Sequence, residues 1–194
     1  MVGTTTPDLE LWPIGNCQVS ALVDREGAIA WACVPRVDGD PVFCSLLNGD
    51  NRDTGIWRFE LVGQVSATQE YIRNTPILVT RLEAEDGSVV EVLDFCPRYE
   101  GKGRMYRPVA ISRIVRPVAG SPRIRVVLRP MRDYGAAVAE TTHGSNHIRY
   151  LCTDVTFRLT TDCPVTHILN ERVFRLERSH AFFFGPDEGY DQDV

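Results

Sequence analysis

Apolar and polar residues alternate along much of this chain with the two-residue period of a β-strand. Trp57, Phe59 and Leu61 share one face of such a segment, while Arg58 and Glu60 share the other. A strand with this pattern buries one face and leaves the other in water. The same alternation recurs in two later segments, 123–131 and 155–160. The pattern therefore predicts half-buried antiparallel strands.

Short apolar segments separated by turn residues are the strands that the sequence predicts. They cover residues 9–14, 19–23, 28–34, 56–62, 66–73, 77–83, 89–95, 109–115, 123–131, 147–152, 155–160, 165–170, 173–177 and 180–184. Residues 42–48, closed by Gly49, are the best helix candidate, and 96–107 and 133–146 are predicted as exposed loops. These elements predict an all-β fold, a large antiparallel sandwich with little helix.

The stretch from Ile14 to Phe43 holds two apolar runs joined by a tight turn. Gly27 ends that turn, at a position where a positive φ is cheap only for glycine. The second run leads directly into residues 35–41, a loop that begins and ends with proline and carries two carboxylates and one guanidinium. We therefore expect a buried hairpin that presents polar groups at a surface.

Length and charge limit the class of protein. The 194 residues are 43% hydrophobic and 24% charged, as in an ordinary soluble protein, and the net charge of −5 argues against a nucleic-acid binder. No apolar run approaches the ~20 residues of a membrane span, and the first residues lack the features of a secretory signal. We expect one domain over residues 1–186, an acidic linker or cut end at 187–194, a cytoplasmic location, and neither nucleic acid nor membrane as partner.

The six cysteines form no CxxC pair and are spread through apolar surroundings, which predicts reduced and mostly buried thiols. A zinc site built from Cys152, Cys163 and His167 is an alternative, but this ligand spacing fits no common pattern. His143 and His147 are separated by glycine and asparagine, which indicates a loop rather than a metal-binding helix. The sequence therefore predicts no metal and no cofactor.

Paired carboxylates would indicate glycoside hydrolysis, which needs two of them at a defined separation. Asp38 and Asp40 are too near in sequence to flank a sugar and are expected to brace their own loop. Glu83, Glu85 and Asp86 belong to a predicted hairpin turn. No carboxylate stands in an apolar neighbourhood that would raise its pKa for acid catalysis, so no catalytic residue is predicted.

Tryptophan side chains offer stacking faces for sugar rings, but in a sandwich they more often belong to the core. Trp12, Trp31 and Trp57 are therefore interpreted as core residues, and Trp31 in particular is expected to be buried. From its residues alone, the chain is a sandwich with two polar loops and no self-sufficient active site.

The order of several short motifs resembles the amino-terminal domain of family 15 glycoside hydrolases, the prokaryotic glucoamylase, glucodextranase and trehalase-like enzymes. The motifs are IGNC (14–17), ALV (21–23), REGAIAW (25–31), CVPRVD (33–38), Phe43, VLDFCP (92–97), ISRIV (111–115) and RDYG (132–135). The chain departs from the usual pattern at Ala30, Val37 and Gly39, where the family has aspartate, phenylalanine and serine.

The resemblance implies a super-β-sandwich followed in longer members by an (α/α)6 barrel that carries two catalytic glutamates. By this resemblance, the chain is the non-catalytic front domain of an inverting α-glucosidic hydrolase, and neither glutamate falls within it. Pro35, Arg36 and Asp38 are then the candidates for a loop that faces the barrel or its sugar, either an α-glucan or trehalose. Without its barrel, such a domain exposes an apolar docking patch, which implies that the isolated chain self-associates. A stand-alone carbohydrate-binding or protein-interaction module is the alternative.

Overall fold

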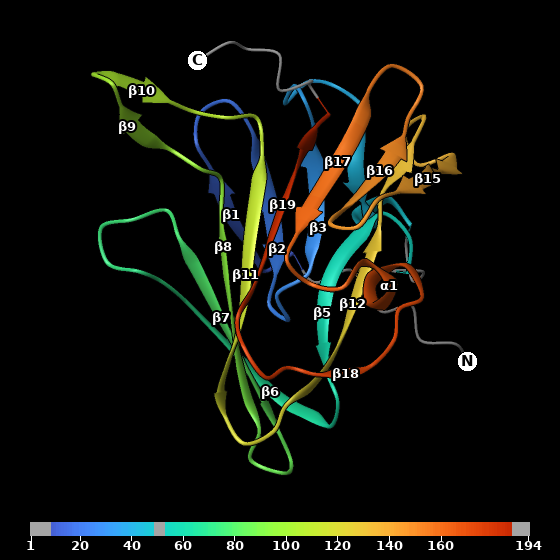
Figure 1. Ribbon diagram of the computed structural model, residues 1–194. Helices are drawn as coiled ribbons and strands as arrows, with labels where there is room; N and C mark the ends of the chain where they lie inside the picture. The colour runs from blue at the N-terminus through green and yellow to red at the C-terminus, as the bar shows by residue number, and fades with distance from the viewer. Residues whose placement is uncertain (1–8, 49–52, 188–194) are drawn as a thin grey trace.

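Two antiparallel sheets form the body of the protein in a computed structural model that describes residues 9–48 and 53–187 (Figure 1). Sheet A has the order β1 (Leu11–Gly15), β2 (Ser20–Asp24), β3 (Ile29–Cys33), β5 (Ile56–Leu61), β12 (Arg123–Arg129), β18 (Phe174–Arg175), with β4 (Pro41–Cys44) also paired to β3. Sheet B has the order β15 (Glu140–His143), β16 (His147–Leu151), β17 (Thr156–Thr161), β19 (His180–Pro186), β11 (Ile111–Ala119), β8 (Val89–Phe95), β7 (Leu78–Ala84), β6 (Gln64–Tyr71). The predicted all-β sandwich is confirmed.

Aromatic side chains from both sheets meet in the core between them. Phe59 of sheet A packs edge-on against Phe182 of sheet B, with ring centroids 5.1 Å apart. Trp57 lies 5.9 Å from Phe184, and Phe43 lies 5.3 Å from the same ring. Trp57 and Phe59 are inward-facing members of the alternating segment 56–62, so the period-two pattern identified the core face of that strand.

Two of the predictions about helix and strand were wrong. In the helix candidate 42–48, the first residues form β4, and only Ser45–Leu47 form a 3-10 turn, η1; Gly49 lies outside the described residues. Residues 165–170, predicted as a strand, instead form helix α1 (Val165–Leu169). Val165 and Ile168 are buried, so the three-residue spacing of these apolar positions outweighs the strand propensity of the segment.

The two predicted loops contain regular hairpins. Residues 96–107 include β9 (Tyr99–Gly101) and β10 (Arg104–Tyr106), and the second loop includes β14 (Ala137–Val138), which pairs with β13 (Met131–Arg132), and β15. The β9–β10 hairpin projects from the body in Figure 1 and is called the arm below. Tyr99 and Tyr106 stack across it, 5.4 Å apart.

Asn16 holds the base of the arm. Its buried side-chain amide donates hydrogen bonds to the carbonyl oxygens of Pro97 and Pro108, each at 2.8 Å. Its Oδ1 accepts hydrogen bonds from the backbone N–H groups of Gln18 and Val19. One side chain therefore fixes both ends of the segment that carries the arm.

A fully buried ion pair on sheet B also contacts sheet A. Arg113 on β11 donates to both carboxylate oxygens of Asp94 on β8, at 2.7 and 2.9 Å, and both side chains have 0% exposure. The same guanidinium donates to the carbonyl oxygens of Trp57 on β5 of sheet A, at 2.6 Å, and of Gly27 in the turn between β2 and β3. It also lies 4.9 Å from the ring centre of Phe59. Arg113 thus satisfies backbone acceptors of one sheet from a strand of the other.

The predicted turn at Asp24–Gly27 is confirmed. The Gly27 N–H donates to the Asp24 carbonyl at 2.9 Å, and Gly27 has a φ of +82°. The expectation that Trp31 is buried was wrong, because this residue is half-buried on β3. Of the helices in the described part of the chain, neither is long and apolar enough to cross a membrane.

Candidate functional site

The loop between β3 and β4 carries the three residues that the sequence singled out, Pro35, Arg36 and Asp38. Arg36 donates to both carboxylate oxygens of Asp38, from Nε at 2.9 Å and from Nη2 at 2.8 Å. Both side chains are largely exposed, at 75% and 65%. The Gly39 N–H donates to the Arg36 carbonyl at 3.0 Å, which closes a turn beneath the pair. Asp38 thus braces its own loop, as expected, whereas Asp40, expected to do the same, accepts a hydrogen bond from another loop.

A second loop, residues 132–136, lies against the first. The Tyr134 N–H donates to Oδ1 of Asp40 at 2.7 Å, a contact between residues 94 positions apart. Asp133 and Tyr134 both have a φ of 55°, which is uncommon for residues with a side chain. Thr153 donates to Oδ1 of Asp133 at 2.5 Å, so one hydrogen bond holds the Tyr134 backbone and another holds the Asp133 side chain. Such enforced conformations are found more often at functional sites than elsewhere.

The two loops together, residues 35–40 and 132–136, form a surface that we call the loop tip. It exposes apolar groups on a braced frame: Val37 is 63% exposed and Tyr134 is 70% exposed. Exposed aromatic and apolar side chains that are held rigidly by their backbone suit recognition of a partner or a sugar ring. The sequence had marked the first loop and the RDYG motif separately, but it did not indicate that Asp40 joins them.

The thiols below the loop tip are poor nucleophiles. Burial, followed by the charge of Asp40, raises the pKa of Cys33 and Cys44. The same two effects raise the pKa of Cys152 to about 11. All three are therefore protonated at neutral pH, whereas reactive cysteines have lowered pKa values. Their burial agrees with the predicted role of small hydrophobic residues.

The Asp38 carboxylate of the loop tip is also unsuited to acid catalysis. The hydrogen bond from Arg36 lowers the pKa of Asp38, which is the opposite of what a general acid at neutral pH requires. Asp86, in the turn between β7 and β8, has a pKa lowered by hydrogen bonds from Ser88. The arrangement of the loop tip therefore favours binding or docking over proton transfer.

No metal site emerges from the described residues. Across 9–48 and 53–187, no group of three or more His, Cys, Asp or Glu side chains is placed to hold an ion. The alternative zinc site at Cys152, Cys163 and His167 is therefore not supported. All six cysteines are free thiols, with Cys17 exposed and four of the others buried.

Comparison with known proteins agrees with the order of the motifs. A family model described as "Trehalase-like, N-terminal" matches residues 1–180. The chain is 26% identical over 134 residues to a trehalase of Mycolicibacterium smegmatis, covering 62% of this chain and 20% of that protein. It is 25% identical over 132 residues to trehalase 2 of Sulfolobus acidocaldarius, covering 68% of this chain and 20% of that protein.

The matched region thus spans about one fifth of the length of these curated relatives. No solved structure matches the chain. Since the family model covers residues 1–180, the match includes the loop tip and every strand before β19. The chain belongs to the family of trehalase-like N-terminal domains.

Proposed function

We propose that this chain is the non-catalytic N-terminal domain of an α-glucosidic hydrolase of the trehalase or glucoamylase type, in glycoside hydrolase family 15. Its partner is a catalytic (α/α)6 barrel in the same polypeptide, which it supports by packing against it. The observation that carries the proposal is the family match over residues 1–180. The barrel supplies the acid and base of an inverting mechanism, with water between two carboxyl groups about 6.5–9.5 Å apart.

The chemistry of the described residues fits this division of labour. Asp38 is paired with Arg36, and Asp94 is sealed between the sheets with Arg113, so neither is available as a proton donor to a sugar. The exposed Val37 and Tyr134 of the loop tip instead offer a rigid contact surface. We assign the loop tip, including Pro35, Arg36 and Asp38, to the rim of the catalytic domain, where it contacts the barrel or the bound sugar.

The direct test is turnover by the complete polypeptide and by the 194-residue chain alone. We expect the complete polypeptide to release glucose from trehalose or maltooligosaccharides, with inversion seen by NMR as β-glucose in the first product. The 194-residue chain alone should release none. Hydrolysis by this chain alone would overturn the proposal.

The role of the loop tip is tested separately in the complete polypeptide. Tyr134→Ala, compared with Val138→Ala on the adjacent exposed strand, should raise KM or lower kcat without lowering the melting temperature. Unchanged kinetics for Tyr134→Ala would reject the proposed contact between the loop tip and the rim of the catalytic domain. The proposal that this chain supports the barrel would still stand.

A stand-alone carbohydrate-binding module is the second candidate, favoured by the 70% exposure of Tyr134 on a braced loop. Saturable binding of trehalose or maltooligosaccharides to the isolated chain, lost in Tyr134→Ala, would support it. We also propose a cytoplasmic location, supported by six free thiols in a chain long enough to bury a core.

A further inference from the structure

The outer face of sheet B has an apolar centre. On β11, Ile111, Arg113 and Val115 point into the core, so Ser112 and Ile114 face outward. Register places Ser112 between Phe95 of β8 and Phe183 of β19. These three side chains form one row across three neighbouring strands.

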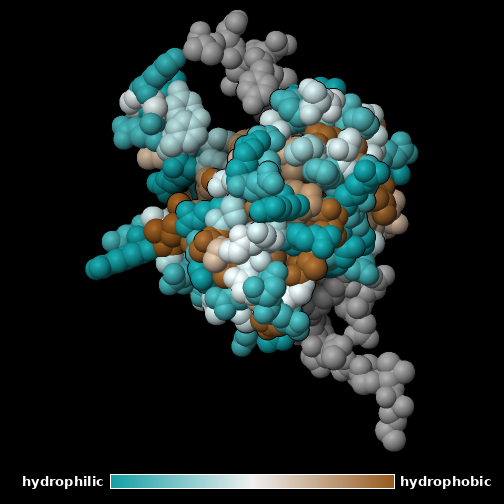
Figure 2. Space-filling view, turned by 60° about the horizontal axis from the view of Figure 1, so that its bottom comes forward, coloured by the Kyte–Doolittle hydropathy of each residue, from teal (hydrophilic) through white to brown (hydrophobic). Residues whose placement is uncertain are grey.

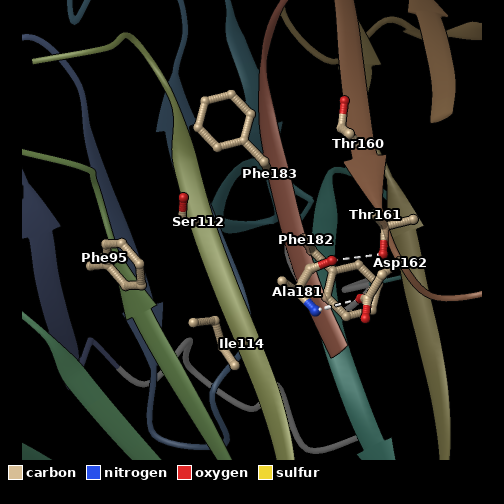
Figure 3. A pocket seen from close by; sticks show the side chains of 9 residues that line it. All are labelled: Phe95, Ser112, Ile114, Thr160, Thr161, Asp162, Ala181, Phe182 and Phe183. Atoms are coloured by element: carbon tan, nitrogen blue, oxygen red, sulfur yellow. Dashed lines mark hydrogen bonds between the residues drawn. The ribbon is translucent and has the colours of Figure 1, made fainter. Parts of the chain in front are cut away.

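A second row lies one step along the strands. Ile114 pairs with Leu93 of β8 on one side and with Ala181 of β19 on the other, and Leu93 in turn pairs with Val79 of β7. Figure 3 shows Phe95, Ser112, Ile114 and Phe183 projecting from the sheet around a shallow pocket. Its volume is about 450 Å³. We call this surface the sheet B stripe; it consists of Val79, Leu93, Phe95, Ser112, Ile114, Ala181 and Phe183.

Charged side chains border the stripe on both sides. One step further along β11, β8 and β7, Arg116 and Arg81 both contact Glu91, at 2.6 and 3.2 Å. Toward β16, Arg149 contacts Asp187 at 2.6 Å. An apolar centre with a polar rim is the usual anatomy of a protein interface. On the face that Figure 2 presents, hydrophobic residues form small areas scattered among hydrophilic ones.

The outer face of sheet A carries paired charges where β5 and β12 meet. Arg58 and Arg125 both contact Glu60, and Arg129 contacts Glu171 at 2.7 Å. The same face also holds apolar side chains, since register places Ile56 beside Arg129 and Val127 beside Arg58. Charge pairs thus occupy part of this face, whereas the sheet B stripe contains none.

The position of β19 indicates what covers the stripe. This strand supplies Ala181 and Phe183 and is the last strand described, ending at Pro186. The family is N-terminal, and the relatives are about five times longer than the matched region. A domain that follows β19 would thus be tethered beside the stripe, at a high effective concentration.

We propose that the sheet B stripe is the docking surface for the domain that follows this chain in the same polypeptide. The proposal rests on the proposed function for the existence of that domain, but it adds the face that is used. A partner of matching chemistry has an apolar centre opposite Phe95, Ile114 and Phe183. In isolation, the 194-residue chain leaves this surface open, so two copies associate weakly through it.

The test uses the complete polypeptide with a protease site inserted after Asp187. After cleavage, we expect the wild-type N-terminal domain to remain bound to the rest on size-exclusion chromatography. Phe183→Glu should weaken this association at least tenfold. Val65→Glu places the same charge on β6 at an exposed apolar position outside the stripe, and it should have no effect. Circular dichroism of the isolated Phe183→Glu chain checks that it folds, as expected for a residue that is 40% exposed.

Three results would overturn the proposal: equal retention of Phe183→Glu and wild type, a homodimer of the complete polypeptide that Phe183→Glu dissociates, or a chain that ends without a further domain. The homodimer would assign the stripe to a second copy. Activity separates the two proposals. Loss of docking in Phe183→Glu without any glycosidase activity in the wild type would sustain the docking surface and reject the proposed function. Glycosidase activity in the wild type together with unaltered docking of Phe183→Glu would support the proposed function and reject the docking surface.

Discussion

The two ends of strand β3 carry the same chemical device in opposite surroundings. At its start, the carbonyl of Gly27 is held by Arg113, which grips Asp94 through two hydrogen bonds with no exposure to water. Beyond its end, Arg36 grips Asp38 through two hydrogen bonds of nearly the same length, with both side chains largely in water. The two arginine–aspartate contacts are alike in geometry, but only Arg113 is buried and also bonds backbone carbonyls outside its own sheet.

Proton affinities reflect this difference. Burial raises the pKa of Asp94, although Arg113 acts against that rise. The hydrogen bond from Arg36 lowers the pKa of Asp38, because little desolvation opposes it. The Arg113–Asp94 pair is a buried link to the second sheet, and the Arg36–Asp38 pair is an ordinary surface ion pair. This comparison teaches that an arginine–aspartate motif in a sequence has no single meaning.

The largest effect is expected from breaking the buried pair. Arg113→Met leaves the Asp94 carboxylate without its partner inside the core, and three backbone and side-chain groups lose hydrogen bonds at once. We expect a loss of about 3–5 kcal/mol in the free energy of unfolding, measured by urea denaturation. Arg113→Met combined with Asp94→Leu should recover part of the loss. Equal stability of Arg113→Met and wild type would contradict the role of this buried link.

The next test separates backbone strain from close packing at the same end of β3. A Cβ at Gly27 would lie 2.9 Å from Cγ2 of Thr80, whereas a Cβ at Gly87, also at positive φ, would meet nothing within 4 Å. Gly87→Ala should therefore cost about 1–2 kcal/mol, from backbone conformation alone. Gly27→Ala should cost more, because it also pushes the turn away from sheet B. Thermal unfolding of both variants would measure the difference, and equal losses would show that the contact with Thr80 is unimportant.

A smaller, local effect is expected at the loop tip. Asp40→Ala removes the acceptor for the Tyr134 N–H, but water can replace it at this exposed site. We expect a cost of about 0.5–1.5 kcal/mol and faster hydrogen exchange at the Tyr134 amide, read by NMR. Asp38→Ala changes a neighbouring carboxylate in the same loop and is the matched control. If both variants speed this exchange equally, the bridge between the loops does not hold Tyr134.

The smallest effect should come from Arg36→Met, the counterpart of the first variant. Its urea midpoint should match that of wild type, since exposed pairs contribute little. The pKa of Asp38, followed by carboxyl NMR, should rise toward its ordinary value when Arg36 is lost. Because the pKa is lowered in the folded protein, any contribution of this pair is present above the unfolded value and disappears in acid, below about pH 4. A large loss of stability of Arg36→Met at neutral pH would show that the exposed pair stabilises the fold as the buried pair does.

Local patterns in the sequence predicted most strands, but they did not predict the contacts between strands. The alternation around Trp57 predicted a core face correctly because it depends only on neighbouring residues. Helix α1 was missed because its residues, VTHIL, favour strands, and the arm was missed because each of its strands has only three residues. The burial of Arg113 could not be seen in ISRIV, where a charged residue between apolar neighbours gives no sign of a partner 19 positions away.

The loop tip illustrates the same limit. Pro35, Arg36 and Asp38 are exposed, as proline and charge both indicate, whereas their contact with a barrel or a sugar stays a prediction. Its join to Tyr134 depends on a hydrogen bond across 94 residues, and no local rule reports such a contact. In the sequence, Tyr134 was noticeable only as part of the RDYG family motif.

The clamp made by Asn16 has a consequence for how this protein can be altered. Because one amide holds the carbonyls of Pro97 and Pro108, the positions where the arm begins and ends are set by the β1–β2 turn and not by the arm itself. The ten residues between these prolines can therefore be exchanged for a shorter turn or a longer insert without disturbing β8 or β11. The Asn16 hydrogen bonds therefore make this edge of the sandwich an insertion site, where foreign peptides or new recognition hairpins can be grafted.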